Sequence, residues 1–388
     1  MAEVTNFEHN GVSLEATESP EAMGGIGDNV VAIVGTAPNR AIGVPANAPY
    51  RISGMLAAEQ LDPTGAESGT LINVVKAILK VVKIPIYVIV VEKGATVAET
   101  MNNVIGGEDP VTGQKLGLQA LAICQEDPTI IGAPGFSAEQ AVHSELASIG
   151  KRIRARVVLD GKDTTVTGQV DNSKLIGGAA LGYDRCYLVH QMPAIYSKAA
   201  QANVFLPPSS LAIAALASVK QWESPGNQVT YAADVSRTVE YNILDKSTDG
   251  DLLNRYGVSY YARTMLGGFS LIGNRSITGK FISYVGLEDA IARKLVKAAQ
   301  KVMSRNLTKS FMEQEVKRID TWLQTLVADE TIPGGKVYLH PELNTVEHYK
   351  NGTWYLCIDY GRYAPNEHMV YQLNASDAII EEFLGDVL

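Results

Sequence analysis

Asp160, two histidines and many serines supply the residue types of a hydrolytic triad. A carboxylate, an imidazole and a serine hydroxyl can together activate a nucleophile, and Asp160 ends a predicted strand, with His143 or His190 as the partner. The nucleophile is the missing member, because the chain has no Gly-x-Ser-x-Gly sequence and no serine in a distinctive nucleophile context. We therefore expect structural roles for Asp160 and His190.

The cysteines do not favour catalysis or a disulfide framework. Cys186 and His190 would lie on one face of a strand, but four residues separate them by about 13 Å. Cys124, Cys186 and Cys357 are widely spaced, and each lies in an apolar run. This pattern predicts buried free thiols in a reducing compartment.

The glycine-rich run at residues 24–27 has the composition of a phosphate-binding loop, but its position is wrong. Such loops follow a strand and open a helix, whereas this run precedes a predicted strand. The segment after that strand, residues 35–38, lacks both the Rossmann glycine spacing and the Lys-Ser/Thr pair of a P-loop. His340 and His348 have no metal-site spacing. We expect no catalytic residue, no cofactor and no metal.

Predicted strands and helices alternate along the first 160 residues, and they position the candidate residues named above. Strands are predicted at residues 30–35, 84–91, 129–132 and 154–160, and helices at 71–82, 97–105, 116–124 and 138–150. A strand at 186–190 and a helix from Ser209 or Ser210 to Trp222 follow. Short strands between helices predict a mostly parallel sheet covered by helices.

The pattern changes from about Ile277. Two helices, at 287–304 and 310–328, precede strands at 336–340, 345–350, 353–359 and 367–373. Asn351-Gly352 is a strong two-residue hairpin signal between two of these strands. The fold class expected for the whole chain is thus α/β followed by α+β with an antiparallel sheet.

The segment at residues 267–276 predicts a strand that ends in a corner. Two glycines precede an alternating apolar run, and Gly273 opens an Asn-Arg-Ser turn that needs positive φ. We expect Gly273, Asn274 and Arg275 to form a structural corner. Arg275 should bind a carboxylate or backbone carbonyls rather than a ligand.

Residues 1–29 have too few large apolar side chains to form a core. They contain six Asp or Glu and no Lys or Arg, within a chain of 388 residues whose net charge is -9. Val12-Ser13-Leu14 alternates like a short strand, and a lone strand cannot satisfy its own backbone. This arm is therefore either disordered or paired with the edge of another sheet, including one in another subunit.

The segment from Lys280 to Arg318 is basic, with nine Lys or Arg against four Asp or Glu. A positive stripe separate from the apolar face of the first helix comprises Lys294, Lys297, Lys301 and Arg305, and the next helix adds Lys309, Lys317 and Arg318. The stripe is either a solvated face or a docking face for an acidic partner. Overall acidity argues against nucleic acid as that partner. The start lacks a signal-peptide pattern, and no run reaches the length of a membrane span, so we expect a soluble, cytosolic chain.

Five elements occur in a fixed order along the chain. They are VVAIVGTAP at 30–38, IIGAPGFS at 130–137, WESPGN at 222–227, Leu253-Asn254 with Gly257-Val258, and GNRS at 273–276. Together they resemble the tail sheath proteins of contractile bacteriophages and related contractile injection particles such as R-type tailocins. The chain has Ile272 where that family often has Trp, and Ser276 where it has Thr. Both replacements keep strand propensity or a hydroxyl.

The resemblance implies a structural subunit rather than an enzyme. Such subunits polymerise as stacked hexameric rings around an inner tail tube and contract to drive the tube through the bacterial envelope. Implied partners are copies of the chain, the tail tube protein, and the baseplate and tail terminator proteins, with no nucleic acid and no direct membrane insertion. The implied location is the virion tail sheath, assembled in the bacterial host cytoplasm. The alternatives are a subtilisin-like hydrolase and a soluble α/β ligand-binding module.

The resemblance also implies a division of the chain. Residues 1–29 would be an N-terminal arm, 30–276 a subtilisin-like α/β sheath domain in the outer part, 277–374 an α+β assembly domain facing the tube, and 375–388 a C-terminal arm. Residues expected to add strands to neighbouring subunits are Val12, Ser13, Leu14, Ile379, Ile380, Phe383 and Leu384. Residues expected to contact an acidic tube are Lys294, Lys297, Lys301 and Arg305, or else Lys309, Lys317 and Arg318.

Overall fold

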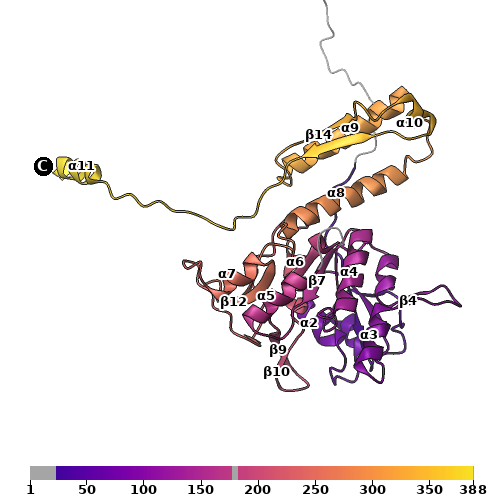
Figure 1. The fold of residues 1–388 in the computed structure, drawn as a ribbon, viewed down its shortest axis with the longest axis vertical. Helices are drawn as coiled ribbons and strands as arrows, with labels where there is room; N and C mark the ends of the chain where they lie inside the picture. Colours follow the sequence, from indigo (N-terminus) through magenta and orange to yellow (C-terminus); the bar gives the residue numbers. More distant parts are fainter. Residues whose placement is uncertain (1–22, 177–181, 388) are drawn as a thin grey trace, which may run out of the picture. The chain divides into compact units, whose positions relative to one another are not determined.

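The structure is a computed structural model that describes residues 23–387 except 177–181 (Figure 1). The predicted arm strand at Val12, Ser13 and Leu14 lies outside the described residues. The chain divides into two compact units. Of the described residues, the large unit comprises 28–176, 182–289 and 364–387, and the small unit comprises 23–27 and 290–363.

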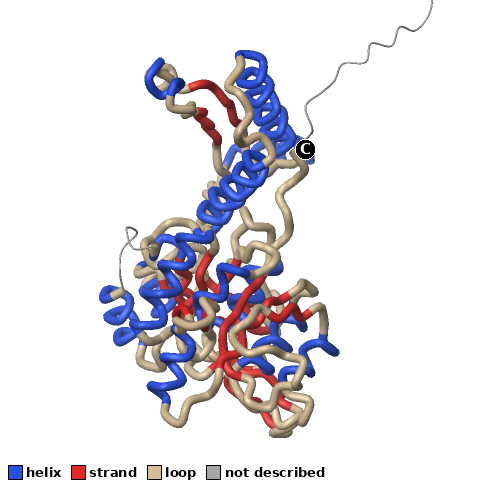
Figure 2. The backbone as a smooth tube through the Cα atoms, turned by 90° about the vertical axis from the view of Figure 1, so that its right-hand side faces the viewer, coloured by secondary structure: helices blue, strands red, loops and turns tan. Residues whose placement is uncertain are grey.

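An eight-stranded mixed sheet forms the centre of the large unit (Figure 2). Its order is β13-β12-β8-β7-β6-β1-β3-β2. The strands are β1 (Val31–Thr36), β2 (Tyr50–Ile52), β3 (Ile86–Val91), β6 (Ile130–Gly132), β7 (Arg156–Asp160), β8 (Cys186–Val189), β12 (Val258–Thr264) and β13 (Gly268–Ile272). All neighbouring strands from β12 to β3 pair in parallel, and only the edge strands β2 and β13 pair antiparallel. The predicted mostly parallel sheet is confirmed.

Helices cover both faces of this sheet. They are α1 (Met55–Ala58), α2 (Leu71–Val81), α3 (Val97–Ile105), α4 (Gln140–Ile153), α5 (Val166–Leu175), α6 (Ser209–Ser218) and α7 (Asp249–Arg255). Val31 and Ile33 of β1 pack in one core with α2 and α6, whereas Ala32 and Val34 pack in a second core with α3 and α4. Because both faces of the strand are buried, it is continuously apolar in sequence.

Shorter elements complete the large unit. They are the 3₁₀ helices η1 (Glu59–Leu61), η2 (Gly117–Ile123) and η4 (Tyr183–Arg185), and the strands β4 (Gly107–Glu108), β5 (Lys115–Leu116), β9 (Pro193–Ser197), β10 (Ala202–Phe205) and β11 (Asp234–Val235). The helix predicted at 116–124 is thus a 3₁₀ helix. Helix α6 ends at Ser218 rather than Trp222, because Asn29 Nδ2 donates to the carbonyls of Leu216, Ala217 and Val219.

The small unit pairs long helices with a two-stranded antiparallel sheet. Its elements are the last part of α8 (Ile282–Gln300), α9 (Lys309–Ala328), β14 (Gly335–Leu339), α10 (Val346–Lys350) and β15 (Leu356–Tyr360). The predicted antiparallel pairing is confirmed, with Val337 opposite Ile358. Helix α11 (Asp377–Val387) follows near the end of the chain.

Two strand predictions in this region are wrong. Residues 346–350 form helix α10 instead of the strand predicted at 345–350, because the Thr345 side chain accepts a hydrogen bond from the His348 amide and caps the first turn. Asn351-Gly352 consequently terminates a helix, with Gly352 at φ 72°, and is not a hairpin turn between strands. Residues 367–373 carry no strand.

The division between the units falls within α8, after the boundary predicted at residues 276 and 277. Ile282 and Val285 in the first turns of α8 pack in the core of the large unit. Asp289 then accepts two hydrogen bonds from Arg185, at 3.1 Å from Nε and 2.8 Å from Nη2. These buried contacts assign the start of α8 to the large unit, although its sequence continues without a break into the small unit.

Candidate interaction surfaces

Three lysines near the end of α8 form a positive surface, which we call the lysine face: Lys294, Lys297 and Lys301. Lys297 and Lys301 are exposed, and Lys294 is half-buried with its Nζ 3.2 Å from the carbonyl oxygen of Gly25. Partial burial, and then the charges of Lys297 and Lys301, lower the pKa of Lys294. The positive charges of Lys297 and Lys301 thus lie near enough to Lys294 to disfavour its charged form.

The other basic residues expected at this surface do not all belong to it. Lys309 and Lys317 are exposed on α9, where Lys309 lies 3.8 Å from Glu313. Arg305 is exposed and its guanidinium lies 5.2 Å from the centre of the Phe311 ring. Arg318, in contrast, is buried, with Nη2 2.6 Å from Glu315, so it does not extend the surface. The spacing of three residues between Glu315 and Arg318 was the sequence signal for this pair.

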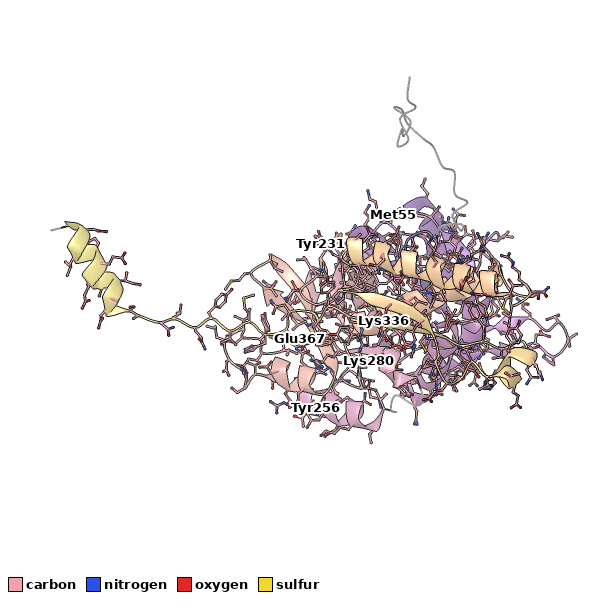
Figure 3. All side chains as sticks on the ribbon, turned by 90° about the horizontal axis from the view of Figure 1, so that it is seen from above. Met55, Tyr231, Tyr256, Lys280, Lys336 and Glu367 are labelled. Carbon is pink, nitrogen blue, oxygen red and sulfur yellow. The ribbon has the colours of Figure 1, made fainter. Side chains whose placement is uncertain are left out.

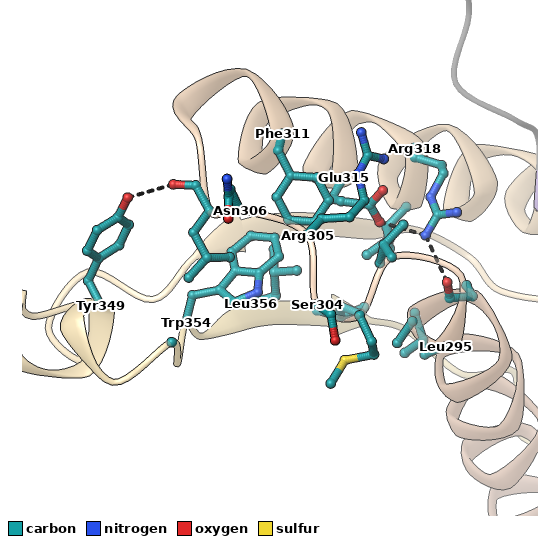
Figure 4. A pocket seen from close by; sticks show the side chains of 18 of the residues that line it. Leu295, Ser304, Arg305, Asn306, Phe311, Glu315, Arg318, Tyr349, Trp354 and Leu356 are labelled. Carbon is teal, nitrogen blue, oxygen red and sulfur yellow. Dashed lines mark hydrogen bonds and ion pairs between the residues drawn. The ribbon is translucent and has the colours of Figure 1, made fainter.

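A groove with a volume of about 740 Å³ lies in the small unit between the end of α8, the first half of α9 and β15 (Figure 4). The rings of Phe311 and Trp354 form part of its wall, with centroids 5.9 Å apart. Arg318 also donates to the carbonyl of Ala298 at 3.4 Å. The sequence reasoning did not find this groove, because its walls come from segments that are separated by up to about 60 positions in the chain.

The predicted corner lies directly after β13. Gly273 has φ 137°, and a Cβ at this position would collide with Ser259, so the backbone requires glycine. Asn274 binds the Ser224 hydroxyl and accepts the Ile282 amide at 2.9 Å through its carbonyl. It thus connects the corner to the first turn of α8.

Arg275 at this corner binds protein groups on three sides. Its Nε and Nη2 both donate to the carboxylate of Glu367, which is labelled in Figure 3, at distances from 2.8 to 3.2 Å. Its Nη1 donates to the Gly279 carbonyl at 2.8 Å, and the guanidinium lies 4.0 Å from the centre of the Phe281 ring. The pair fastens the segment after β15 to the large unit.

The apolar residues of the expected C-terminal arm lie on helix α11 and not on a strand. They are Ile379, Ile380, Phe383 and Leu384. Every side chain described from Asp377 to Asp386 is exposed. Four large apolar side chains on one exposed helix indicate a surface that packs against another protein.

At the carboxyl edge of the sheet, Asp160 is bound by backbone and serine groups instead of a histidine. Its Oδ2 accepts from the Gly135 amide at 2.9 Å and the Ser137 hydroxyl at 2.7 Å, and its Oδ1 accepts from the Ser209 amide at 2.8 Å. Burial raises the pKa of Asp160, and these hydrogen bonds oppose that shift. The carboxylate connects β6, β7 and the start of α6, which is a structural role.

Neither candidate histidine is joined to Asp160. His143 Nδ1 lies 2.8 Å from the Tyr183 hydroxyl. His190 is 2% exposed, and within the described residues its ring nitrogens have no hydrogen-bond partner. Burial, followed by the nearby Arg237 charge, lowers the pKa of His190 to about 4. Among the described residues, Asp160 and the two histidines therefore do not form the hydrogen-bonded arrangement of a catalytic triad.

Among the described residues, no cluster of His, Cys, Asp and Glu could hold a metal ion. No described helix is long and apolar enough to cross a membrane. Cys186 is buried and Cys124 half-buried, and burial raises the pKa of the Cys124 thiol to about 12, which disfavours the nucleophilic thiolate.

Known proteins similar in sequence are tail sheath proteins. The chain is 25% identical over 313 residues to a protein named as a prophage major tail sheath protein of Pseudomonas aeruginosa (strain UCBPP-PA14), covering 76% of this chain and 79% of that protein. It is 23% identical over 406 aligned positions to the tail sheath protein of Escherichia phage P2, covering 98% of each. No family model matches the chain.

Solved structures with a similar fold come from contractile injection systems. The contracted PVC sheath complex matches with a TM-score of 0.70 at 14% identity, covering 97% of this chain and 100% of that one. The contracted helical sheath of the anti-feeding prophage matches with a TM-score of 0.65 at 16% identity, covering 95% and 99%. The chain is thus similar in sequence to tail sheath proteins of phages and prophages, and similar in fold to the sheaths of contractile injection systems over nearly its whole length.

Proposed function

We propose that this chain is the structural subunit of a contractile tail sheath. It polymerises as stacked hexameric rings around an inner tail tube, and contraction of the rings drives the tube through the bacterial envelope. The observation that carries this proposal is the near-complete coverage, in sequence, of the phage P2 tail sheath protein. The match extends over both the strand-and-helix region and the later helices and strands, so it supports the proposal with more than one part of the chain.

The finer architecture is part of the same proposal. Residues 30–276 form a subtilisin-like domain in the outer part of the sheath, residues 277–374 face the tube, and residues 1–29 and 375–388 are arms that reach neighbouring subunits. The partners are further copies of the chain, the tube protein, and the baseplate and terminator proteins, and assembly takes place in the host cytoplasm. A structural role fits the contacts of Asp160, which bind backbone and serine groups in place of a catalytic histidine.

The lysine face contacts the tube in this proposal. Its support is the spacing of three and four residues between Lys294, Lys297 and Lys301 at the end of α8, where Lys297 and Lys301 are exposed. Exposed ion pairs contribute only about 0.2 to 1 kcal/mol each. Many such contacts, repeated along a tube, would favour assembly of the extended sheath and still allow its release when contraction begins.

Negative-stain electron microscopy of the purified full chain tests the proposed function. The expected result is striated tubes or rings, formed alone or after addition of the tube protein. A protein that remains monomeric with and without the tube protein would contradict the proposal. An active-site serine probe run in parallel separates the enzyme alternative, since labelling of a single serine would indicate a hydrolase and no labelling is expected.

A further inference from the structure

The first described residues of the chain lie beside the lysine face. Lys294 Nζ donates to the carbonyl oxygen of Gly25 at 3.2 Å, and Met23 and Ile26, which flank this contact in sequence, are half-buried. Gly25 and Lys294 belong to the same compact unit. The contact therefore fixes the N-terminal arm, residues 1–29, to the part of α8 that carries the three lysines.

The residues that precede this contact are acidic. Residues 1–22, which we call the acidic segment, contain no Lys or Arg. Their carboxylates belong to Glu3, Glu8, Glu15, Glu18 and Glu21. The acidic segment and the lysine face thus carry opposite charges within one chain, and opposite charges attract when they are brought close together.

The reach of the acidic segment matches the length of the lysine face. The four residues from Gly25 back to Glu21 span at most about 14 Å, and Glu18 lies at most about 11 Å farther on. On α8, the other two lysines of the face lie about 4.5 Å and about 10.5 Å beyond Lys294 along the helix axis. Both glutamates can therefore reach these lysines while Gly25 stays bound to Lys294.

We propose that the acidic segment covers the lysine face of its own chain before assembly, with Glu18 and Glu21 bound to Lys297 and Lys301. The contact is autoinhibitory, because it closes the surface that would otherwise bind the tube. The closure rests on the proposed function, in which the lysine face contacts the tube, whereas the contact itself does not depend on it. In the proposed sheath the arm reaches a neighbouring subunit, and its departure uncovers the lysines as subunits join.

The occupant is the chain's own arm because Gly25 and Lys294 already hold the arm at this face. A tethered group is present at an effective concentration on the order of millimolar, far above that of a free partner in solution. Exposed ion pairs are individually weak and are screened by salt, so the closure is readily reversed. A weak contact that is favoured by a tether suits a surface that must open during assembly.

Zero-length crosslinking of the full chain tests the contact. A carbodiimide joins a carboxylate to a lysine amine only where the two groups touch. Heavy-isotope and unlabelled chains are mixed, the monomeric fraction is isolated by gel filtration, and mass spectrometry locates the crosslinks. The ion pair between Asp28 and Lys220, at 3.1 Å in the large unit, sets the reaction conditions as a positive control. We expect crosslinks from Glu18 or Glu21 to the lysine face within single chains.

Other lysines of the small unit make the crosslinking test specific. Lys309 and Lys350 are exposed in the same unit and should give at least fivefold fewer crosslinks to the acidic segment than the lysine face gives. Crosslinks mainly between heavy and light chains would show that the arm covers another copy, and this result would overturn the inference. Crosslinks spread equally over all these lysines, or none to the lysine face, would also overturn it.

Binding to purified tube protein tests the closure. Glu18→Gln with Glu21→Gln should lower the Kd in cosedimentation at least about threefold, because the apparent Kd falls as the open fraction rises. Glu3→Gln with Glu8→Gln removes the same charge from the acidic segment and is the matched control, which should bind as the parent does. Equal binding by the two variants would refute the closure. If none of the proteins binds tubes, the tube contact of the proposed function fails and the closure with it, while the crosslinks still decide whether the arm covers the lysine face.

Discussion

Protonation of His190 should destabilise the folded chain in mild acid. The imidazole is buried at the end of β8, and the pKa of His190 falls from its usual 6.5 to about 4. The unfolded chain therefore binds more protons than the folded chain between these values, and stability falls as the pH drops from about 7 toward 4. The shift corresponds to about 3 kcal/mol once both states are protonated, and to about 2 kcal/mol at pH 5.

The variant His190→Leu removes this proton-binding difference. It also removes two ring nitrogens that have no hydrogen-bond partner among the described residues, so its stability at pH 8 should equal or exceed that of the parent. The free energy of unfolding is measured by urea denaturation with circular dichroism at pH 8 and pH 5. We expect the parent to lose about 2 kcal/mol more than the variant between the two pH values.

The comparison isolates His190 from other titrating groups. Asp160 also has a shifted pKa, raised by burial, but it is present in both proteins and its contribution cancels. His368→Leu, an exposed position, is the matched control and should behave as the parent does. Equal pH dependence in the parent and His190→Leu, within about 0.5 kcal/mol, would refute the reasoning about burial.

Three further predictions concern assembly and packing. Replacing all three residues of the lysine face by Glu should reduce sheath assembly on tubes in electron micrographs, whereas the exposed control Lys93→Glu should not. If the triple variant assembled as well as the parent, the tube contact would be contradicted. Removing residues 1–20 should leave folded monomers by circular dichroism that form no tubes, and normal tubes would exclude this role. Glu315→Gln should lower the free energy of unfolding, measured by urea denaturation, by about 3 kcal/mol, because the buried charge of Arg318 loses its carboxylate partner. The exposed control Glu313→Gln should lower it by less than about 0.5 kcal/mol. Similar losses in the two variants would show that the Glu315–Arg318 pair is not buried in solution.

The sheet was predictable because its signal is local. Buried strands such as β1 and β3 are mostly apolar runs of six residues, and the helices α2 and α3 that follow them in the chain carry regular apolar faces. The prediction failed at α10, where six residues can be strand or helix and one threonine cap decides. Short segments lack enough residues to reveal their period.

The candidate site was predictable only in part. Lys294, Lys297 and Lys301 are close in sequence, so helical spacing was enough to bring them together. Arg318 carries the same positive charge, yet its contacts with Glu315 and the carbonyl of Ala298 keep it buried in the small unit. Whether a charged residue on an amphipathic helix is exposed depends on what covers that helix, and sequence spacing does not contain this information.

The sequence by itself determined the alternation of strands and helices, the positive end of α8, the Gly273 corner and the lack of a recognisable nucleophile. Each depends on residues that are neighbours in the chain. Only the tertiary structure decided that Asn29 caps the end of α6, that Arg275 binds Glu367 across 92 positions, and that Phe311 and Trp354 line the same groove. These contacts join distant segments, and their partners are selected by packing of the whole unit rather than by any local pattern.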